Sequence, residues 1–546
     1  MDRLPTEIFI KITSYLSLDD KLNCILVCYK WYDLIKMAHL YKSLDFRKQE
    51  KLQQAILFFH DYNYKQSVQD LIISDCCNSV HRRASLPATF PNLKTLKFIA
   101  TEEPKSIPID QDSQLKKNVQ MWQRLERVTE RLRYYSITLC LLRSPQPVIN
   151  LRSIHIIYHS DQFYEESRHA ENYYKFRSLL RYIKNAPHLA DLSISNTFIS
   201  LKDLEEIHHS CPELETLALN HVNMSFSNRH INMILGAFQK FNLSGVHVWK
   251  SADRLHSLTI SNTPSCIEED IVIHKTWLHY LGQKYPNLSH LSLWMPLPDN
   301  TTSSTLPVIE EELITNFSYW THLKNFNMNI YPFTSKIIQA MNMNDLYLEQ
   351  LTLYGDSSEL EKQLSCLKSL KRKENIKDLI LEYRRKKVTD TTTSSSFWCI
   401  HQTSILIETC LLKEFKQLYH LSITSKEGII FCNLDTFTAL LRSIPEQLQT
   451  LEIEGLLLEP LSTHHDSQVV LEHPIQLKRL NIKNCFITDN DEQQQLAILN
   501  NWLTYQLLPN CPLLTSFDFD EQFAVNKLLY DGHNRSISVL GLKADI

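Results

Sequence analysis

The sequence predicts an α/β solenoid, in which a curved parallel sheet carries helices on its convex side, preceded by a small all-α domain. Three observations support this fold class: a recurring six-residue apolar pattern, helical segments between its copies, and an N-terminal stretch without the pattern. Stacked copies of one unit bury a continuous core that no single unit can bury alone. A solenoid grows in one dimension, which suits a chain of 546 residues.

The repeat reads apolar-x-x-apolar-x-apolar. Its last two apolar positions are spaced by two, which places both on one face of a short strand, and the first fits the preceding turn. The step between copies, for example 25 residues from Leu189 to Leu214, leaves room for one helix and two turns. Clear copies begin at Leu93, Leu189, Leu214, Leu255, Leu288, Leu348, Leu418, Leu448 and Leu477, and looser copies at Tyr41, Val68, Leu151, Leu323, Ile376, Leu514 and Ile537.

The segments between copies are predicted to be helical. Residues 200–211 place Leu201, Leu204 and Ile207 on one helical stripe, and Pro212 then precedes the next copy. Proline cannot continue a helix and pushes the residue before it toward extended geometry, so it separates helix from strand.

Two irregularities interrupt the repeat. The step from Leu93 to Leu151 is too long for one unit and hides either a degenerate repeat or an insertion. A further copy at Leu243 begins only 12 residues before Leu255, so these two cannot both be ordinary units. We expect the repeat domain to span residues 41–546, with loops near 101–120, 296–310 and 386–398.

Residues 1–40 lack the repeat and are predicted to form helices. Pro5 stands near the first helical position, with acidic Glu7 in the first turn. Ile8, Ile12 and Tyr15 follow on one stripe. Three short helices cannot bury so much apolar surface alone, so a partner or the first repeat must cover the rest.

The order of residues in this segment resembles an F-box, and the proline-then-repeat order resembles the leucine-rich repeats of F-box proteins. The resemblance implies that residues 1–40 bind the Skp-type adaptor of a cullin-RING ubiquitin ligase. It does not separate the residues that hold the helices together from those that reach the adaptor. The positions that match the F-box signature are Leu4, Pro5, Ile8, Leu16, Leu22, Val27, Cys28 and Trp31.

The function implied by the resemblance is substrate recognition in an SCF-type E3 ubiquitin ligase, with the repeats binding the target protein. In that role the chain is not an enzyme, because the chemistry lies in other subunits. No phosphate-binding glycine loop, GxSxG or HExxH motif is present. The alternative is a leucine-rich-repeat scaffold without ligase activity. Residues 1–40 alone could also be a helical cap on the solenoid.

The expected substrate site lies on the concave face of the sheet, because residues that flank the strand leucines point away from the core. Trp294 is a large apolar side chain at a position expected to face solvent, as interface anchors often are. Acidic residues outnumber basic ones toward the C-terminal end, which favours a target segment with Lys or Arg. The candidates are His290, Trp294, Asn327, Asn329, Glu382, Glu452, Glu454, Arg479, Lys483, Asp518 and Asp520.

Composition excludes several partner classes. The formal net charge of the chain is −4, and residues 1–40 carry equal numbers of acidic and basic side chains. Neither the whole chain nor its first 40 residues therefore has the basic signature of nucleic-acid binding. No apolar run approaches the ~18 residues that span a bilayer, so we expect no membrane partner.

The 13 cysteines are scattered, which is typical of reduced thiols in the cytoplasm or nucleus. Neither Cys76-Cys77 nor His464-His465 has further ligands at metal-site spacing, so no cofactor is expected.

Overall fold

The structure is a computed structural model of the whole chain, residues 1–546. The residues that it describes are 5–16, 18–35, 41–61, 66–74, 85–99, 115, 117–132, 136–159, 166–224, 250–262, 271–295, 306–383, 412–425, 430–433, 440–442, 444–454, 456–459, 476–487, 508–521, 528–531 and 536–539.

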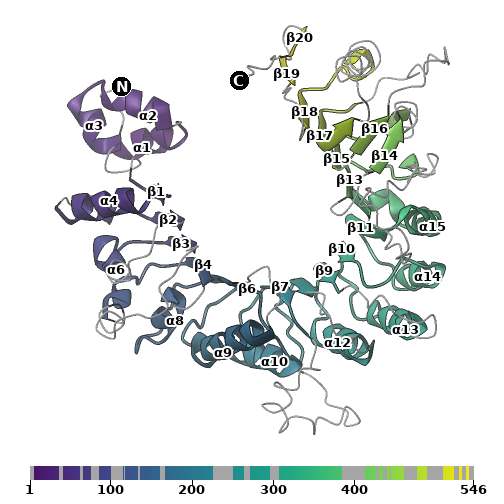
Figure 1. Cartoon of the computed structure of the whole chain (residues 1–546), viewed down its shortest axis with the longest axis horizontal. Helices are drawn as coiled ribbons and strands as arrows, with labels where there is room; N and C mark the ends of the chain where they lie inside the picture. Colours follow the sequence, from purple (N-terminus) through teal and green to yellow (C-terminus); the bar gives the residue numbers. More distant parts are fainter. Residues whose placement is uncertain are drawn as a thin grey trace, which may run out of the picture. The chain divides into compact units, whose positions relative to one another are not determined.

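The chain divides into two compact units, Met1–Ile273 and His274–Ile546. In the N-terminal unit, three helices precede strands that pair in parallel and in chain order from β1 to β8 (Figure 1). Its elements are α1 (Thr6–Ser14), α2 (Leu18–Ile25), α3 (Tyr29–Ile35), β1 (Ser43–Phe46), α4 (Gln49–Asp61), β2 (Asp70–Ser74), α6 (Leu86–Thr89), β3 (Thr95–Ile99), η3 (Val119–Met121), β4 (Arg127–Leu132), α8 (Ile137–Leu142), β5 (Ser153–Tyr158), α9 (Glu166–Ile183), β6 (Asp191–Ser195), α10 (Leu201–Ser210), β7 (Thr216–Val222) and β8 (Ser257–Asn262).

The C-terminal unit begins inside α12 and has its own parallel sheet, in the order β9, β10, β11, β12, β13, β15, β17, β18. The short strands β14 and β16 pair with each other, and β16 pairs with the end of β17. Its elements are α12 (Ile271–Lys284), β9 (His290–Trp294), α13 (Leu306–Asn316), β10 (Asn325–Met328), α14 (Ser335–Met343), β11 (Gln350–Gly355), α15 (Ser357–Leu367), η4 (Lys373–Asn375), β12 (Asp378–Tyr383), β13 (His420–Ser425), β14 (Ile430–Asn433), β15 (Thr450–Glu454), β16 (Leu456–Glu459), β17 (Arg479–Ile487), α19 (Leu508–Asn510), β18 (Ser516–Glu521), β19 (Leu528–Asp531) and β20 (Ser536–Val539).

The register of each sheet stacks the repeated apolar positions on one another. Leu351 of β11 stands beside Leu379 of β12, and Leu353 beside Leu381, with none of the four exposed. Burying one such side chain stabilises the fold by about 1.5–3 kcal/mol. In each unit the helices cover the face where these side chains point (Figure 1). The opposite face, called the open face below, carries the alternating residues. The predicted fold class is therefore confirmed.

The turns that lead into the strands repeat one hydrogen-bond arrangement. The backbone N–H groups of Lys94 and Thr95 both donate to the carbonyl oxygen of Gln69, at 2.7 and 3.0 Å. In the next repeat, Glu126 and Arg127 donate in the same way to the carbonyl of Lys94, at 2.8 and 2.9 Å. The shared acceptor satisfies two backbone donors at once and fixes each turn beside its neighbour.

The long step between Leu93 and Leu151 contains a degenerate repeat. Strand β4 pairs with β3 and β5 in register, and its first two pattern positions are the buried Leu125 and Val128. The third position is Glu130, which is fully buried. Because a carboxylate stands where the pattern requires an apolar residue, the sequence pattern does not reveal this copy.

The Glu130 carboxylate caps the start of α8. It accepts hydrogen bonds from the backbone N–H of Ile137 at 2.7 Å and of Thr138 at 2.8 Å, and from the hydroxyl of Ser136 at 2.9 Å. These donors have no acceptor within the helix, because the first turn of any helix leaves its N–H groups unpaired. Burial raises the pKa of the Glu130 carboxyl above its ordinary value, and the hydrogen bonds oppose this shift.

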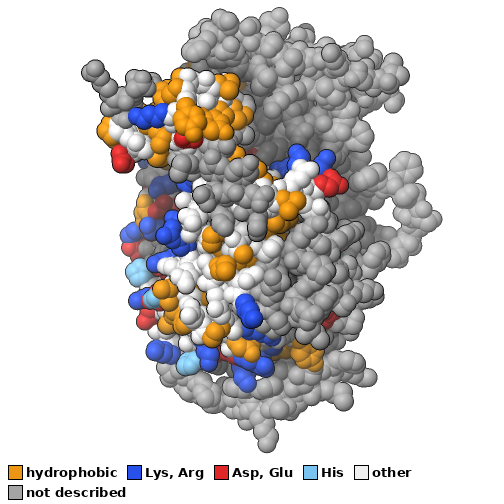
Figure 2. Space-filling model, turned by 90° about the vertical axis from the view of Figure 1, so that its left-hand side faces the viewer, with side chains coloured by type: hydrophobic (Ala, Val, Ile, Leu, Met, Phe, Trp, Pro, Cys, Tyr) orange, Lys and Arg blue, Asp and Glu red, His pale blue; other side chains and the backbone are white. Residues whose placement is uncertain are grey.

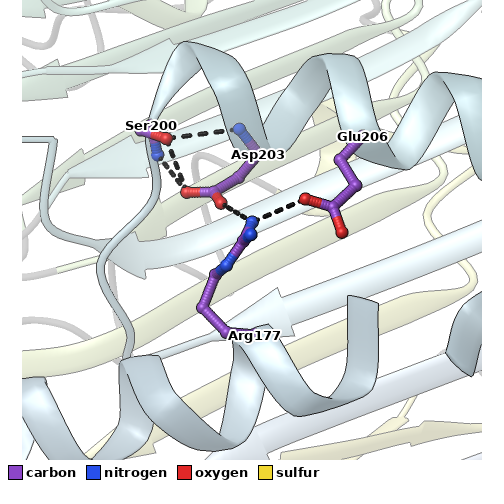
Figure 3. Close-up of polar contacts among 4 residues, drawn as sticks. All are labelled: Arg177, Ser200, Asp203 and Glu206. Carbon is purple, nitrogen blue, oxygen red and sulfur yellow. Dashed lines mark hydrogen bonds and ion pairs between the residues drawn. The ribbon is translucent and has the colours of Figure 1, made fainter. Parts of the chain in front are cut away.

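A second buried carboxylate joins two neighbouring helices (Figure 3). Arg177 of α9 donates to Asp203 and Glu206 of α10, at 2.5 and 2.7 Å. Asp203 also closes a capping box with Ser200, which accepts from the Asp203 N–H at 3.2 Å and donates its own N–H to the carboxylate at 2.8 Å. Asp203 is only 1% exposed, so its negative charge depends on these donors.

Three expectations need revision or comment. The copy expected at Ile537 is wrong, because β20 pairs antiparallel with β19. The loop expected at 296–310 gives way to α13 at Leu306, with Pro307 in the first turn where proline suits a helix. Similarly, η3 lies at the end of the loop expected at 101–120.

Some expectations fall on parts of the chain outside the described residues. These are the copy at Leu243 and the loop at 386–398.

Replacing Glu130 with alanine should lower the free energy of unfolding by about 2–4 kcal/mol, because two buried N–H groups lose their acceptor. Thermal unfolding followed by circular dichroism measures the loss. Glu126→Ala is the matched control, since Glu126 makes only a partly exposed ion pair with Lys94 at 3.6 Å. Equal and small effects in both variants would contradict the capping role.

Glu130 should also make stability depend on pH. Its pKa is higher in the folded protein than the ordinary 4.5, so its stabilising contribution is complete below pH 4.5 and is lost as pH rises through the folded pKa. Glu130→Gln cannot titrate and should therefore lose less stability than the wild type between pH 4.5 and neutrality. Burial also raises the pKa of Asp203. Part of the dependence of stability on pH should therefore remain in the wild type and in Glu130→Gln alike. Parallel pH profiles of the melting temperature would refute this assignment.

Candidate partner-binding surface

The three N-terminal helices are held together by a small inner face. Phe9 and Thr13 of α1 and Ile35 of α3 are buried, and the ring of Trp31 packs on that of Phe9 with centroids 5.0 Å apart. The hydroxyl of Thr13 donates to the backbone carbonyl of Phe9 at 3.0 Å, which satisfies it without a partner from another helix.

The outer face of the same helices is apolar and exposed. Directly after α1 it includes Tyr15, which is 81% exposed, and directly after α2 it includes Leu26, which is 82% exposed. Figure 2 shows hydrophobic side chains gathered over these helices. Apolar patches of this kind on a soluble protein mark sites of interaction. The seven residues of this N-terminal apolar surface are Ile8, Ile12, Tyr15, Leu22, Leu26, Val27 and Tyr29.

The structure distributes the expected adaptor residues between the two faces. Ile8, Leu22 and Val27 belong to the N-terminal apolar surface, whereas Trp31 packs inward on Phe9. Of the remaining expected residues, Pro5 and Cys28 are exposed, Leu16 is half-buried and Leu4 lies outside the described residues.

The list of expected adaptor residues omitted four members of this surface. Ile12 and Tyr15 share the helical stripe of Ile8 at spacings of four and seven, so the spacing alone could have added them. Leu26 and Tyr29 lie at the end of α2 and the start of α3. Their exposure depends on where α2 ends, which the apolar pattern does not define.

The expected substrate residues lie on strands of the C-terminal unit, at open-face positions. Their strands are β9 for His290 and Trp294, β10 for Asn327, with Asn329 directly after it, β12 for Glu382, β15 for Glu452 and Glu454, β17 for Arg479 and Lys483, and β18 for Asp518 and Asp520. The side chains of Lys483, Asp518 and Asp520 lie outside the described residues. Because β9 to β18 pair in register, these positions form rows across the strands.

Trp294 is less free than the sequence led us to expect. Its ring lies edge-to-face against that of Tyr354, with centroids 4.8 Å apart, and it is half-buried. The Tyr354 side chain is hydrogen-bonded to Glu382 and Asn327, and burial together with the Glu382 charge raises the pKa of its phenol. Glu382 itself is only 6% exposed. Trp294, Tyr354 and Glu382 therefore form a connected cluster, which the alternation of strand residues does not predict.

A histidine lies on another row of the same open face. His420 lies between Asp378, at 3.5 Å, and Glu452, at 3.7 Å. Hydrogen bonding to Asp378 and the charge of Glu452 raise the pKa of its imidazole, despite partial burial. Asn481 donates to the other oxygen of Glu452 at 3.0 Å.

Features typical of other classes of site were also sought. Among the described residues, no group of three His, Cys, Asp or Glu side chains is placed to hold a metal ion. None of the described helices has both the length and the apolar character that crossing a membrane requires. The two paired motifs considered as metal ligands, Cys76-Cys77 and His464-His465, lie outside the described residues.

Comparison with known proteins identifies the N-terminal segment. The family model described as F-box-like matches residues 1–47, which extend seven residues beyond the boundary expected from the sequence. No curated protein matches the chain.

Two solved structures give only weak likenesses. An internalin from Listeria monocytogenes is 14% identical, over 74% of this chain and 88% of its own, with a TM-score of 0.28. A protein from Bacteroides fragilis is 13% identical, over 46% of this chain and 64% of its own, with a TM-score of 0.27. The fold assignment therefore rests on the strand pairing described above. The chain carries an F-box-like domain at residues 1–47, followed by parallel-strand repeats with the apolar spacing of leucine-rich repeats.

Proposed function

We propose that this protein is the substrate-recognition subunit of an SCF-type E3 ubiquitin ligase. The F-box-like domain binds a Skp-type adaptor, and through it a cullin-RING ligase, while the repeats bind the protein to be ubiquitinated. The protein acts in the cytoplasm or nucleus, where such ligases work. The observation that supports this proposal is the N-terminal apolar surface, seven exposed side chains on a domain that matches the F-box-like family.

Covering the N-terminal apolar surface with a binding partner is energetically favourable. Removing apolar area from water is worth about 25 cal/mol per Å². Tyr15, Leu26 and Tyr29 are each about four-fifths exposed and contribute the largest areas. The inner face of the helices does not depend on this surface, because Phe9 and Trp31 pack beneath it. The domain is therefore suited to keep its shape while it binds and releases an adaptor.

The repeats supply the second half of the function. The proposed target site is the open face of the C-terminal unit, where the described members are His290, Trp294, Asn327, Asn329, Glu382, Glu452, Glu454 and Arg479. The chain performs no covalent step in this role. Holding a target lysine near a charged ubiquitin carrier raises its effective concentration, and other subunits carry out the transfer.

The alternative function is a repeat scaffold that binds partners without a ligase. It uses the same open face and differs only in the occupant of the N-terminal apolar surface. The match of residues 1–47 to the F-box-like family favours the ligase, because adaptor binding is what such a domain implies.

The triple variant Ile8→Ala, Leu26→Ala, Val27→Ala should weaken adaptor binding by about a hundredfold or more, since each truncation removes roughly 1 kcal/mol of buried apolar contact. Titration calorimetry with purified Skp-type adaptor measures the change. The variant should stay folded, because all three side chains are exposed.

Two controls separate binding from folding. Ile149→Ala with Met343→Ala removes side chains that are 59% and 78% exposed elsewhere in the chain, and should leave adaptor affinity unchanged. Phe9→Ala should lose adaptor binding together with the helical signal of residues 1–47. Wild-type adaptor affinity in the outer-face triple variant would refute the N-terminal apolar surface as the adaptor site, whereas no adaptor binding by the wild-type chain would exclude the ligase function and leave the scaffold.

A further inference from the structure

An aromatic and acidic strip crosses the open face of the C-terminal unit. It begins at Trp294 on β9, continues through Tyr354 on β11 and Glu382 on β12, and reaches β15. Contacts connect the first part of the strip, since Tyr354 touches Trp294 on one side and is hydrogen-bonded to Glu382 on the other, and His420 lies between Asp378 and Glu452. We define the strip by six residues: Trp294, Tyr354, Asp378, Glu382, Glu452 and Glu454.

The strip is negatively charged. Against its four carboxylates, the described open-face side chains of this unit include one guanidinium, that of Arg479, and the imidazole of His420, which lies between Asp378 and Glu452. The lysines at the leading edge of these strands are already engaged, because Lys324 and Lys377 both pair with Glu349, at 3.6 and 2.8 Å. They therefore do not neutralise the strip.

The open face of the N-terminal unit has a different character. Its described charged positions carry both signs, with Lys97, Arg127 and Arg131 against Asp45, Asp70 and Asp191. Asp191 is moreover occupied, since it accepts from Ser153 at 2.8 Å and contacts His155 at 2.6 Å. An excess of one charge is thus a property of the strip and not of every sheet face in the chain.

An unsatisfied polar group lies beside the strip. Thr352 occupies an open-face position of β11, between Asn327 and Ile380 in the register and two residues before Tyr354. It is 1% exposed, and its hydroxyl has no hydrogen-bond partner among the described residues. Buried hydroxyls without a partner are costly and uncommon in folded proteins.

We propose that the strip binds an extended, arginine-bearing segment of a target protein. This inference rests on the proposed function and specifies the class of target. Arginine fits the two kinds of group present, because its planar guanidinium both stacks on aromatic rings and pairs with carboxylates through two hydrogen bonds. One arginine stacks on the rings of Trp294 and Tyr354, and another pairs with Glu452 and Glu454.

The dimensions of the strip favour a peptide over a small cation. From β9 to β15 there are five strand steps, through β10, β11, β12 and β13. At about 4.8 Å per step the strip spans roughly 24 Å. An extended chain covers about 3.3 Å per residue, so seven or eight residues reach from one end to the other.

The test uses the full chain and a fluorescein-labelled peptide of nine residues that alternates arginine and serine. Fluorescence anisotropy should show saturable binding that weakens as salt rises, and the same peptide with glutamate in place of arginine should not bind. Glu452→Gln with Glu454→Gln should raise the Kd by about tenfold or more at low salt. Trp294→Ala should raise it by about threefold to tenfold, even at high salt where carboxylate pairing is screened.

A matched control changes the same charge elsewhere. Asp45→Asn with Asp70→Asn neutralises two carboxylates on the open face of the N-terminal unit and should leave the Kd within twofold. Melting temperatures confirm that each variant is folded. Binding of the glutamate peptide, or an equal loss of affinity in the control variant, would overturn the proposal.

Adaptor binding by the same samples separates this proposal from the proposed function. Normal adaptor affinity without arginine-peptide binding would refute the arginine-bearing target and keep the ligase. Arginine-peptide binding without adaptor affinity would support the strip and replace the ligase by the scaffold.

Discussion

Every repeat of this protein depends on its neighbour to cover its apolar edge. The strand contributes two inward side chains, such as Leu351 and Leu353, and these are shielded only when the adjacent strand lies in exact register. The shared carbonyl of each leading turn, as at Gln69, holds that register from one repeat to the next. Because the inward positions are fixed in this way, the alternating positions are left on a regular open face, where surface chemistry varies without disturbing the core.

Much of this architecture could be predicted from the sequence, because period-two spacing after a helix-ending proline reports strand position directly. Strands at Leu217 and Leu480 lie where the pattern places them. The repeat at β4 was concealed by Glu130, whose burial depends on donors at the start of α8 that no pattern of apolar residues reveals. The copy at Ile537 failed for the opposite reason, since a matching spacing there belongs to a hairpin.

The candidate sites were less predictable than the fold. The sequence placed Ile8 and Trp31 in one signature, but their opposite orientations arise from how three short helices pack around Phe9. Similarly, alternation put Trp294 on the open face without indicating that Tyr354, two strands away, reaches its ring. Contacts between side chains of different strands depend on rotamers as well as on register, and the spacing of apolar residues in the sequence predicts neither.

The buried carboxylate of β4 has a consequence for the way the chain loses its structure. A row of stacked repeats unfolds in blocks, and the boundaries between blocks fall where neighbouring repeats are coupled most weakly. At the third pattern position β3 and β5 contribute Phe98 and Ile156, while β4 contributes Glu130 between them. Apolar coupling is interrupted at this rung, so we expect heat to divide the N-terminal unit here. The helices and strands before β4 should then open as one cooperative segment, while the repeats that follow keep their order.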